Sequence, residues 1–233
     1  MVNIPSTEEL SEAMVYFGHR VSKCHPKMGP YIHSIKNNVH LIDLEKTRDG
    51  LKRALDFVKE VAFKNGKILF VGTKPPAQIV LKKYAEEVGM PYVVERWLGG
   101  TLTNFSVISE LIKKMKKMEE EKERGEWKKY PKKELMDLEK ELARLSLLVG
   151  GMRNLEKIPE AIYVVDLSVE KTAVREARKM KVRSIGLVDT NNDPTLVDFP
   201  IPGNDDAIKS IEMITKLITE AIKEGQEKIG AKK

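Results

Sequence analysis

Acidic side chains and one histidine are the residues of this chain best suited to bind a metal. Asp189, Asp193, Asp205 and Asp206 lie in two loops that follow neighbouring predicted elements, and His19 lies in an earlier loop. Carboxylates brought together without a counter-charge repel one another, so a bound cation is one solution, and basic neighbours or separation in space are the others. These five residues are therefore candidate ligands of one divalent ion, zinc or magnesium, although no motif requires a cofactor.

The same residues define an alternative, enzymatic function. A metal-dependent phosphoryl-transfer or sugar-phosphate enzyme would hold its metal with Asp189 and Asp193 and its phosphate with Lys74, because ligands gather at the carboxyl ends of parallel strands. Asp43 and Asp166 also follow predicted strands, where capping or turn formation is the simpler role. The chain lacks the glycine-rich phosphate-binding motifs and any recognisable nucleophile turn, so nucleotide binding and triad catalysis have no specific support.

Basic side chains form two groups suited to RNA phosphates. The first is Arg20, Lys23, His25, Lys27 and Lys36, and the second is Lys113, Lys114, Lys116, Lys117, Arg124, Lys128, Lys129, Lys132 and Lys133. Trp127 and Tyr130 accompany the second group, and exposed aromatics beside lysine suit stacking on bases. Neighbouring glutamates would instead give a self-paired, solvated face, but the lysines of 113–117 precede the acidic block, which favours RNA contact.

Composition narrows the class of protein. The 233 residues are 41% hydrophobic with a net charge of +6, which is enough for a sizeable core and favours an anionic partner. Cys24 is the only cysteine, no apolar run approaches the ~20 residues that span a bilayer, and residues 1–10 lack the features of a signal peptide. We therefore expect a cytoplasmic protein, and its Lys- and Glu-rich composition with two glutamines is typical of heat-adapted proteins.

A capping box at Ser6 predicts a short N-terminal helix that extends through Met14 to Phe17. After this helix, strands and helices alternate along most of the chain. The predicted strands are 39–42, 68–72, 92–97, 161–165 and 184–188, and the predicted helices are 44–63, 77–88, 170–180 and 207–228. Short apolar runs separated by amphipathic helices indicate βαβ crossovers. The fold class is therefore α/β, a flavodoxin-like three-layer sandwich with about five parallel strands.

A leucine-patterned segment interrupts this alternation. Apolar residues recur at three- and four-residue steps on both sides of a polar turn at 123–131, which predicts an antiparallel, coiled-coil-like helical hairpin with arms about 30 Å long. The chain then divides into the first part of the α/β domain (1–104), the inserted hairpin (105–150) and the second part of the domain (151–233). Such an arm favours a docking component over a compact enzyme.

Motifs throughout the chain resemble those of the bacterial-type small-subunit ribosomal protein two family. They are Arg96-Trp97-Leu98-Gly99-Gly100 with Leu102-Thr103-Asn104, Phe17-Gly18-His19, Pro26-Lys27-Met28, Ile42-x-Leu44-x-Lys46-Thr47, residues 68–74, Val188-Asp189-Thr190-Asn191 with Asp193-Pro194, and residues 201–208. Lys74, Arg96, Trp97 and Asn104 match positions of the family's motifs, which makes them candidate RNA-binding residues. The family usually has Trp-Asn where this chain has Cys24-His25, and the short end at 230–233 lacks the acidic tail of many relatives.

This resemblance implies a non-catalytic, structural constituent of the small ribosomal subunit that carries a flavodoxin-like domain with an inserted hairpin. It also implies binding to small-subunit rRNA and to neighbouring ribosomal proteins. Among these would be the large mRNA-binding protein built from OB-folds, which the family helps to recruit during translation. Neither a membrane nor a small-molecule substrate is implied.

Overall fold

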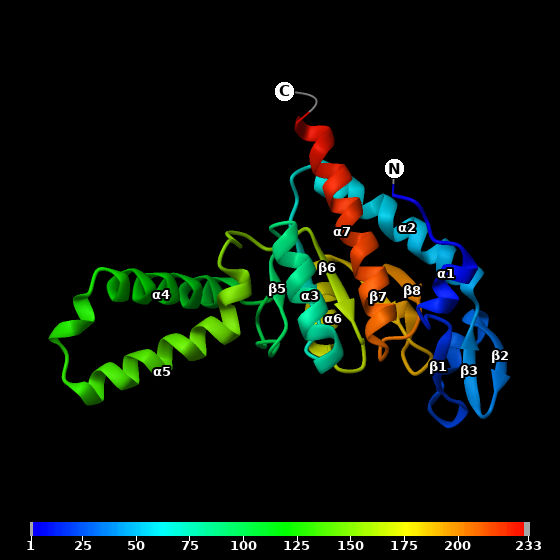
Figure 1. Ribbon diagram of the computed structural model, residues 1–233, viewed down its shortest axis with the longest axis horizontal. Helices are drawn as coiled ribbons and strands as arrows, with labels where there is room; N and C mark the ends of the chain where they lie inside the picture. Colours follow the sequence, from blue (N-terminus) through cyan, green and yellow to red (C-terminus); the bar gives the residue numbers. More distant parts are fainter. Residues whose placement is uncertain (1, 231–233) are drawn as a thin grey trace.

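The computed structural model describes residues 2–230, and its centre is a five-stranded parallel sheet (Figure 1). The strands, in spatial order, are β5 (Tyr92–Val93), β4 (Ile68–Val71), β6 (Ala161–Val165), β7 (Arg183–Val188) and β8 (Phe199–Pro202). The pairs Phe70–Tyr163 and Tyr163–Ile185 set the register of the three central strands. Met1 and residues 231–233 lie outside the described residues. They belong to the segments in which we expect no signal peptide and no acidic tail.

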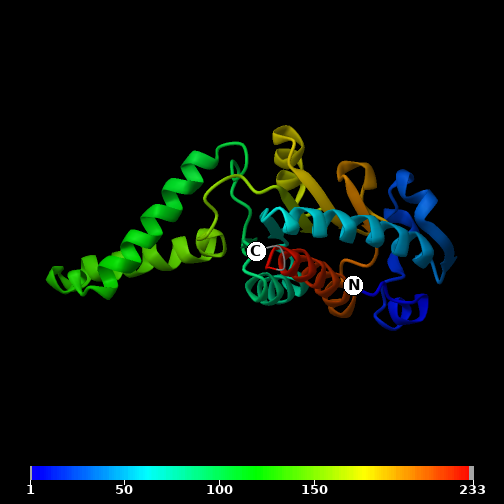
Figure 2. The ribbon, with the colours of Figure 1, turned by 90° about the horizontal axis from the view of Figure 1, so that it is seen from above.

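Helices cover both faces of this sheet. Three of them, α2 (Leu44–Phe63), α3 (Pro75–Glu87) and α7 (Ile208–Gly230), pack on one face, and α6 (Lys171–Met180) packs on the other (Figure 2). Side chains alternate along β4, so that Ile68 and Phe70 face the first layer while Leu69 and Val71 face the second. The predicted flavodoxin-like three-layer α/β sandwich is confirmed.

The sequence correctly predicted five parallel strands, but one of the five was the wrong segment. Residues 39–42 form β3 of a separate antiparallel sheet of β1 (Phe17–Arg20), β3 (Val39–Ile42) and β2 (Ile32–Lys36). The fifth parallel strand is β8, which its two prolines concealed, and β8 lies at the edge of the sheet, where proline is tolerated. The predicted strand at 92–97 is also shorter, since β5 ends at Val93.

The N-terminal helix α1 (Thr7–Glu12) is shorter than predicted. Its capping box is present, with the Ser6 hydroxyl accepting from the Glu9 N–H and the Glu9 carboxylate accepting from the Ser6 N–H. The helix ends before Met14, whose φ of 60° is left-handed, so the predicted continuation to Phe17 is wrong. The chain then passes through β1 and two 3-10 turns, η1 (Val21–Lys23) and η2 (Pro26–Tyr31).

The predicted helical hairpin is present and projects away from the α/β domain (Figures 1 and 2). Its elements are α4 (Phe105–Glu123), the 3-10 turn η3 (Glu126–Lys129), α5 (Lys132–Val149) and a final turn η4 (Gly150–Met152). Ile112 and Met115 of α4 and Leu145 and Val149 of α5 belong to one buried apolar cluster, which continues into the sheet. No helix in the described part of the chain is both long and apolar enough to cross a membrane.

Candidate functional site

The carboxyl ends of four parallel strands bring one lysine and several carboxylates together. Lys74 follows β4, Asp166 follows β6, Asp189 follows β7, and Asp205 and Asp206 follow β8. The Lys74 Nζ lies 3.0 Å from Asp166 Oδ2 and 3.3 Å from Asp205 Oδ1, and it also pairs with Asp206. The sheet edge therefore gathers the predicted side chains as the geometry of an open parallel sheet requires.

The charges at this edge are strongly coupled. Burial lowers the pKa of Lys74, but hydrogen bonds and charges of Asp206, Asp205 and Asp166 outweigh burial and raise that pKa above its usual value. Asp205 is fully buried, and burial together with the charges of Asp189 and Asp166 raises the pKa of its carboxyl well above the usual range. The Lys74 ammonium thus neutralises carboxylates, which argues against its predicted role in holding a phosphate.

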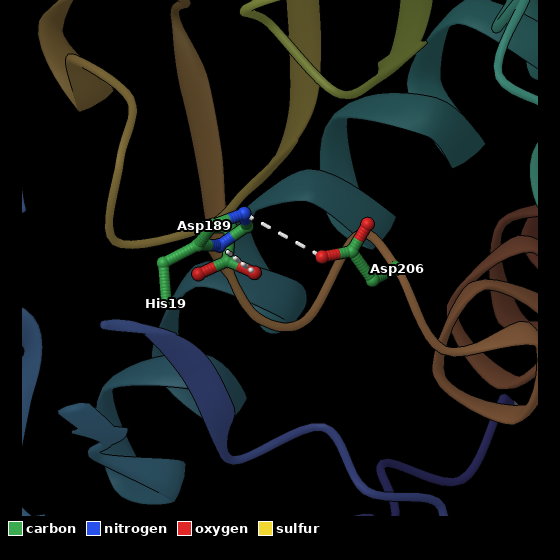
Figure 3. A group of neighbouring side chains, drawn as sticks. All are labelled: His19, Asp189 and Asp206. Atoms are coloured by element: carbon green, nitrogen blue, oxygen red, sulfur yellow. Dashed lines mark ion pairs between the residues drawn. The ribbon is translucent and has the colours of Figure 1, made fainter. Parts of the chain in front are cut away.

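His19 reaches the same edge from the antiparallel sheet (Figure 3). A Cβ on Gly18 would lie 2.6 Å from the Thr190 methyl, so a glycine at this position lets β1 approach the loop after β7. The His19 N–H donates to Thr190 Oγ1 at 2.8 Å. The His19 ring places Nδ1 3.1 Å from Asp189 Oδ2 and Nε2 3.5 Å from Asp206 Oδ2. The hydrogen bond to Asp189 raises the pKa of His19 despite the opposing effect of burial.

His19, Asp189 and Asp206 form a group that fits a divalent cation. One possible ligand atom from each lies within 4.8 Å of the others, and an imidazole with two carboxylates is a donor set that zinc accepts. The His19 ring would bind an ion through one nitrogen, and that bond would replace one of its two present contacts with a carboxylate. At the whole edge, four carboxyl groups share one ammonium and one imidazole, so a cation would reduce the remaining repulsion.

Asp193 does not join this group, contrary to the prediction. Its Oδ2 pairs with Lys27 Nζ at 2.7 Å, and its Oδ1 caps the 3-10 turn η5 (Pro194–Leu196) by accepting from the Thr195 N–H at 2.9 Å. Asp43 likewise has the simpler role considered for it, because its Oδ1 accepts from the first N–H groups of α2. Asp166 combines both roles: one oxygen shapes the turn through Ser168, and the other pairs with Lys74.

The predicted basic group of the N-terminal region is exposed only in part. Arg20, Lys23 and Lys36 are exposed and have no acidic partner among the described residues. Lys27 pairs with Asp193, and half-buried His25 caps η2 by accepting from the Lys27 N–H. Three of the five side chains are therefore free to meet an anion.

The basic residues of the hairpin are divided between paired and unpaired side chains. Acidic partners lie within 4.0 Å of Lys114, Lys117 and Arg124, of which Lys114 reaches across to Glu141 of α5 at 2.8 Å. The idea that charge is segregated along the arm is therefore only partly right. The exposed hairpin lysines with no acidic partner in the described chain are Lys113, Lys128, Lys129, Lys132, Lys133 and Lys140, and half-buried Lys116 has none either.

The two tryptophans are not exposed, which corrects the predicted stacking role of Trp127. Trp127 is 3% exposed and packs in the hairpin seam under Lys122, whose Nζ lies 5.6 Å from the ring centre. Trp97 is also buried and donates its indole N–H to Glu176. Tyr130 is exposed, with Lys129 Nζ 5.3 Å above its ring, and remains available for stacking.

Sequence reasoning missed Glu176, which organises the loop between β5 and the hairpin. Besides the Trp97 indole, the Glu176 carboxylate accepts from the N–H groups of Gly100, Leu102 and Thr103 at 2.8–3.1 Å. Arg96 and Asn104, at either side of this loop, are exposed. A sequence pattern could have pointed to Glu176, because it is the one acid on the apolar face of an otherwise regular amphipathic helix.

A model of the family described as Ribosomal protein S2 matches residues 10–225. The matched segment contains the α/β domain, the sheet-edge cluster and the whole hairpin. The family is a structural, non-enzymatic component of the ribosome. The chain therefore belongs to the ribosomal protein S2 family and is a structural protein of the small ribosomal subunit.

Proposed function

We propose that this protein is a cytoplasmic ribosomal constituent that binds small-subunit rRNA through the exposed cations of its hairpin and its N-terminal region. The observation that carries this proposal is the projecting pair α4 and α5 (Figure 1). The pair buries its apolar seam internally, and together with the turn η3 it leaves Lys113, Lys128, Lys132 and Lys133 exposed without acidic partners in the described chain. An arm of this kind suits contact with phosphates outside the domain.

Sedimentation tests this function. A tagged copy expressed in cells should sediment with the small subunit and should stay there when unbound protein is washed away. A peak only at the position of free protein would overturn the proposal and would revive the metal-dependent enzyme, whose test is turnover of phosphate esters with magnesium.

The contact with RNA has its own test. Changing Lys113, Lys128, Lys132 and Lys133 together to Gln should reduce the slope of log binding constant against log salt by about 3, because each phosphate contact contributes roughly 0.7–0.9. Lys114 and Lys117, which already have acidic partners, provide the control pair when changed to Gln, with a smaller expected effect. An unchanged slope in the fourfold variant would show that this face does not meet RNA.

We also propose that the protein helps to recruit the mRNA-binding ribosomal protein built from OB-folds and contacts other small-subunit proteins. Family membership supports this role. Small subunits prepared from cells depleted of this protein should contain less of the OB-fold protein, and adding the purified chain back should restore it. Undiminished OB-fold protein in the depleted subunits would contradict the role.

We further propose that His19, Asp189 and Asp206 hold one divalent cation, zinc in preference to magnesium because of the imidazole ligand. Purified protein should bind about one zinc per chain and melt at a higher temperature with zinc present, since a ligand that binds only the folded state stabilises it. His19→Gln should abolish both effects, while His33→Gln, at an exposed position of β2, should change neither. Equal zinc content in both variants would exclude the site.

A further inference from the structure

Helix α6 carries a basic face that plays no part in the sites described above. Lys171, Arg175, Arg178 and Lys179 are all exposed and occupy positions i, i+4, i+7 and i+8, which place them on one side of the helix. Ala173, Val174 and Ala177 lie on the opposite side and pack into the sheet. The exposed stripe is about 12 Å long at ~1.5 Å per residue.

These four cations have no acidic partner in the part of the chain that the structure describes. Helices α2, α3, α4, α5 and α7 mix exposed acids with exposed bases, whereas α6 is the described helix whose exposed charges are all positive. Like charges at i, i+3 and i+4 destabilise a helix. The helix dipole favours Arg178 and Lys179 in the last turn, but it disfavours Lys171 at the first residue. Folding therefore does not explain the stripe.

A cavity of about 480 Å³ extends this surface beyond the end of α6. Its lining is Arg178, Lys181, Val182, Arg183, Ser184, Thr195, Leu196, Val197 and Asp198. Arg183 pairs with Asp198 at 2.7 Å, which leaves two lining cations without an acidic partner among the described residues. The Thr195 hydroxyl accepts from Lys27 Nζ at 2.9 Å, so one residue of the basic N-terminal region contacts the wall of the cavity.

We infer that the α6 face and this cavity bind the phosphate backbone of small-subunit rRNA, an inference that rests on the proposed function. Positive charge without local compensation is complementary to a polyanion. No apolar side chain is exposed between the four cations, and Leu196 is the exposed apolar side chain of the cavity lining, whereas the core of a protein–protein interface is depleted of charge. The stripe also lacks aromatic and amide side chains, so its contacts position the RNA without reading its sequence.

The test compares two variants of the full chain that lose the same charge. The first changes Lys171, Arg175, Arg178 and Lys179 to Gln, and the control changes the exposed Lys52, Arg53, Lys82 and Lys209 of α2, α3 and α7 to Gln. Filter binding to small-subunit rRNA is measured from about 50 to 300 mM salt. The α6 variant should lower the salt slope by about 3, and the control should lower it by less than about 1.

The outcomes separate this inference from the proposed function. Wild-type protein that fails to bind the RNA would overturn both. If the wild type binds and the two variants have equal salt slopes, the α6 surface alone is overturned. It is also overturned if the α6 variant no longer associates with the particle while its salt slope for RNA is unchanged. That second result would indicate a protein partner for α6. If circular dichroism shows that the fourfold variant is misfolded, the double variant Arg175→Gln with Arg178→Gln takes its place. The expected decrease of its salt slope is about 1.5.

Discussion

The Glu176 carboxylate of α6 accepts a hydrogen bond from the Trp97 indole Nε1 at 3.1 Å. The same carboxylate accepts from backbone N–H groups of the loop at 100–103, which leads into α4. One buried side chain thereby holds the start of the hairpin against the helix that carries the basic face. This contact links the hairpin surface to the α6 surface, which are two of the proposed RNA surfaces.

Glu176→Gln should destabilise the protein by about 2–4 kcal/mol. The change removes a charged acceptor and turns an amide N–H₂ towards donors, which leaves buried N–H groups without partners. Chemical denaturation measures the free energy of unfolding, and Glu156→Gln, at an exposed position outside this loop, is the control with no expected change. A Glu176→Gln variant as stable as the wild type would refute the organising role of the carboxylate.

The same carboxylate predicts how stability depends on pH. Burial raises the pKa of Glu176, but the N–H groups of Gly100, Leu102 and Thr103 and the Trp97 indole outweigh burial and lower that pKa below the usual value. A lowered folded-state pKa contributes stability that is present above the unfolded pKa of ~4.3 and is lost as pH falls through the folded value. Unfolding free energy measured from pH 6 to pH 3 should therefore fall more steeply for wild type than for Glu176→Gln. Parallel curves would contradict this assignment.

Gly151→Ala should destabilise the return of the hairpin to the sheet. A Cβ on Gly151 would clash with the Tyr92 carbonyl oxygen, a backbone atom of β5 that cannot move without disturbing the sheet. We expect a loss of at least ~2 kcal/mol, as for overpacked cores. Gly99→Ala, which meets no atom within 4 Å, should leave the melting temperature nearly unchanged. Equal melting temperatures for the two variants would show that the strand tolerates the contact.

Trp127 should act through packing alone. Its indole Nε1 is buried without a hydrogen-bond partner among the described residues, so Trp127→Phe loses no such bond. We expect Trp127→Phe to cost only about 1–2 kcal/mol for the smaller ring and to leave the salt slope of RNA binding unchanged, while Trp127→Ala costs about 3–5 kcal/mol. A large loss of RNA affinity in the Phe variant, with stability retained, would restore the stacking role that its burial argues against.

Most of the fold was predictable because its signals are local. The helix 44–63 has the bounds expected from its apolar spacing and its Asp43 cap, and the buried run at 68–71 is an interior strand. Strand β8 was not predictable in the same way. Pro200 and Pro202 argue against a strand, and only the position of β8 at the sheet edge permits them.

The sheet-edge cluster was predictable for a topological reason, and its details were not. Residues that follow parallel strands meet at one edge, which correctly brought Asp189, Asp205 and Asp206 together with Lys74. Asp193 comes four residues after Asp189, and its pairing with Lys27 depends on how η2 packs against η5, which no local pattern encodes. The burial of Trp97 and Trp127 also depends on tertiary packing.

Lysine footprinting of the assembled small subunit tests the central claim most directly. Lys113, Lys128, Lys132 and Lys133 on the hairpin and Lys171 and Lys179 on α6 are exposed in the free chain. They should be protected from acetylation in the particle and should become reactive again when nuclease removes the RNA. Acetylation of these lysines at the same rate in the particle as in the free protein would contradict the assignment of these surfaces to rRNA.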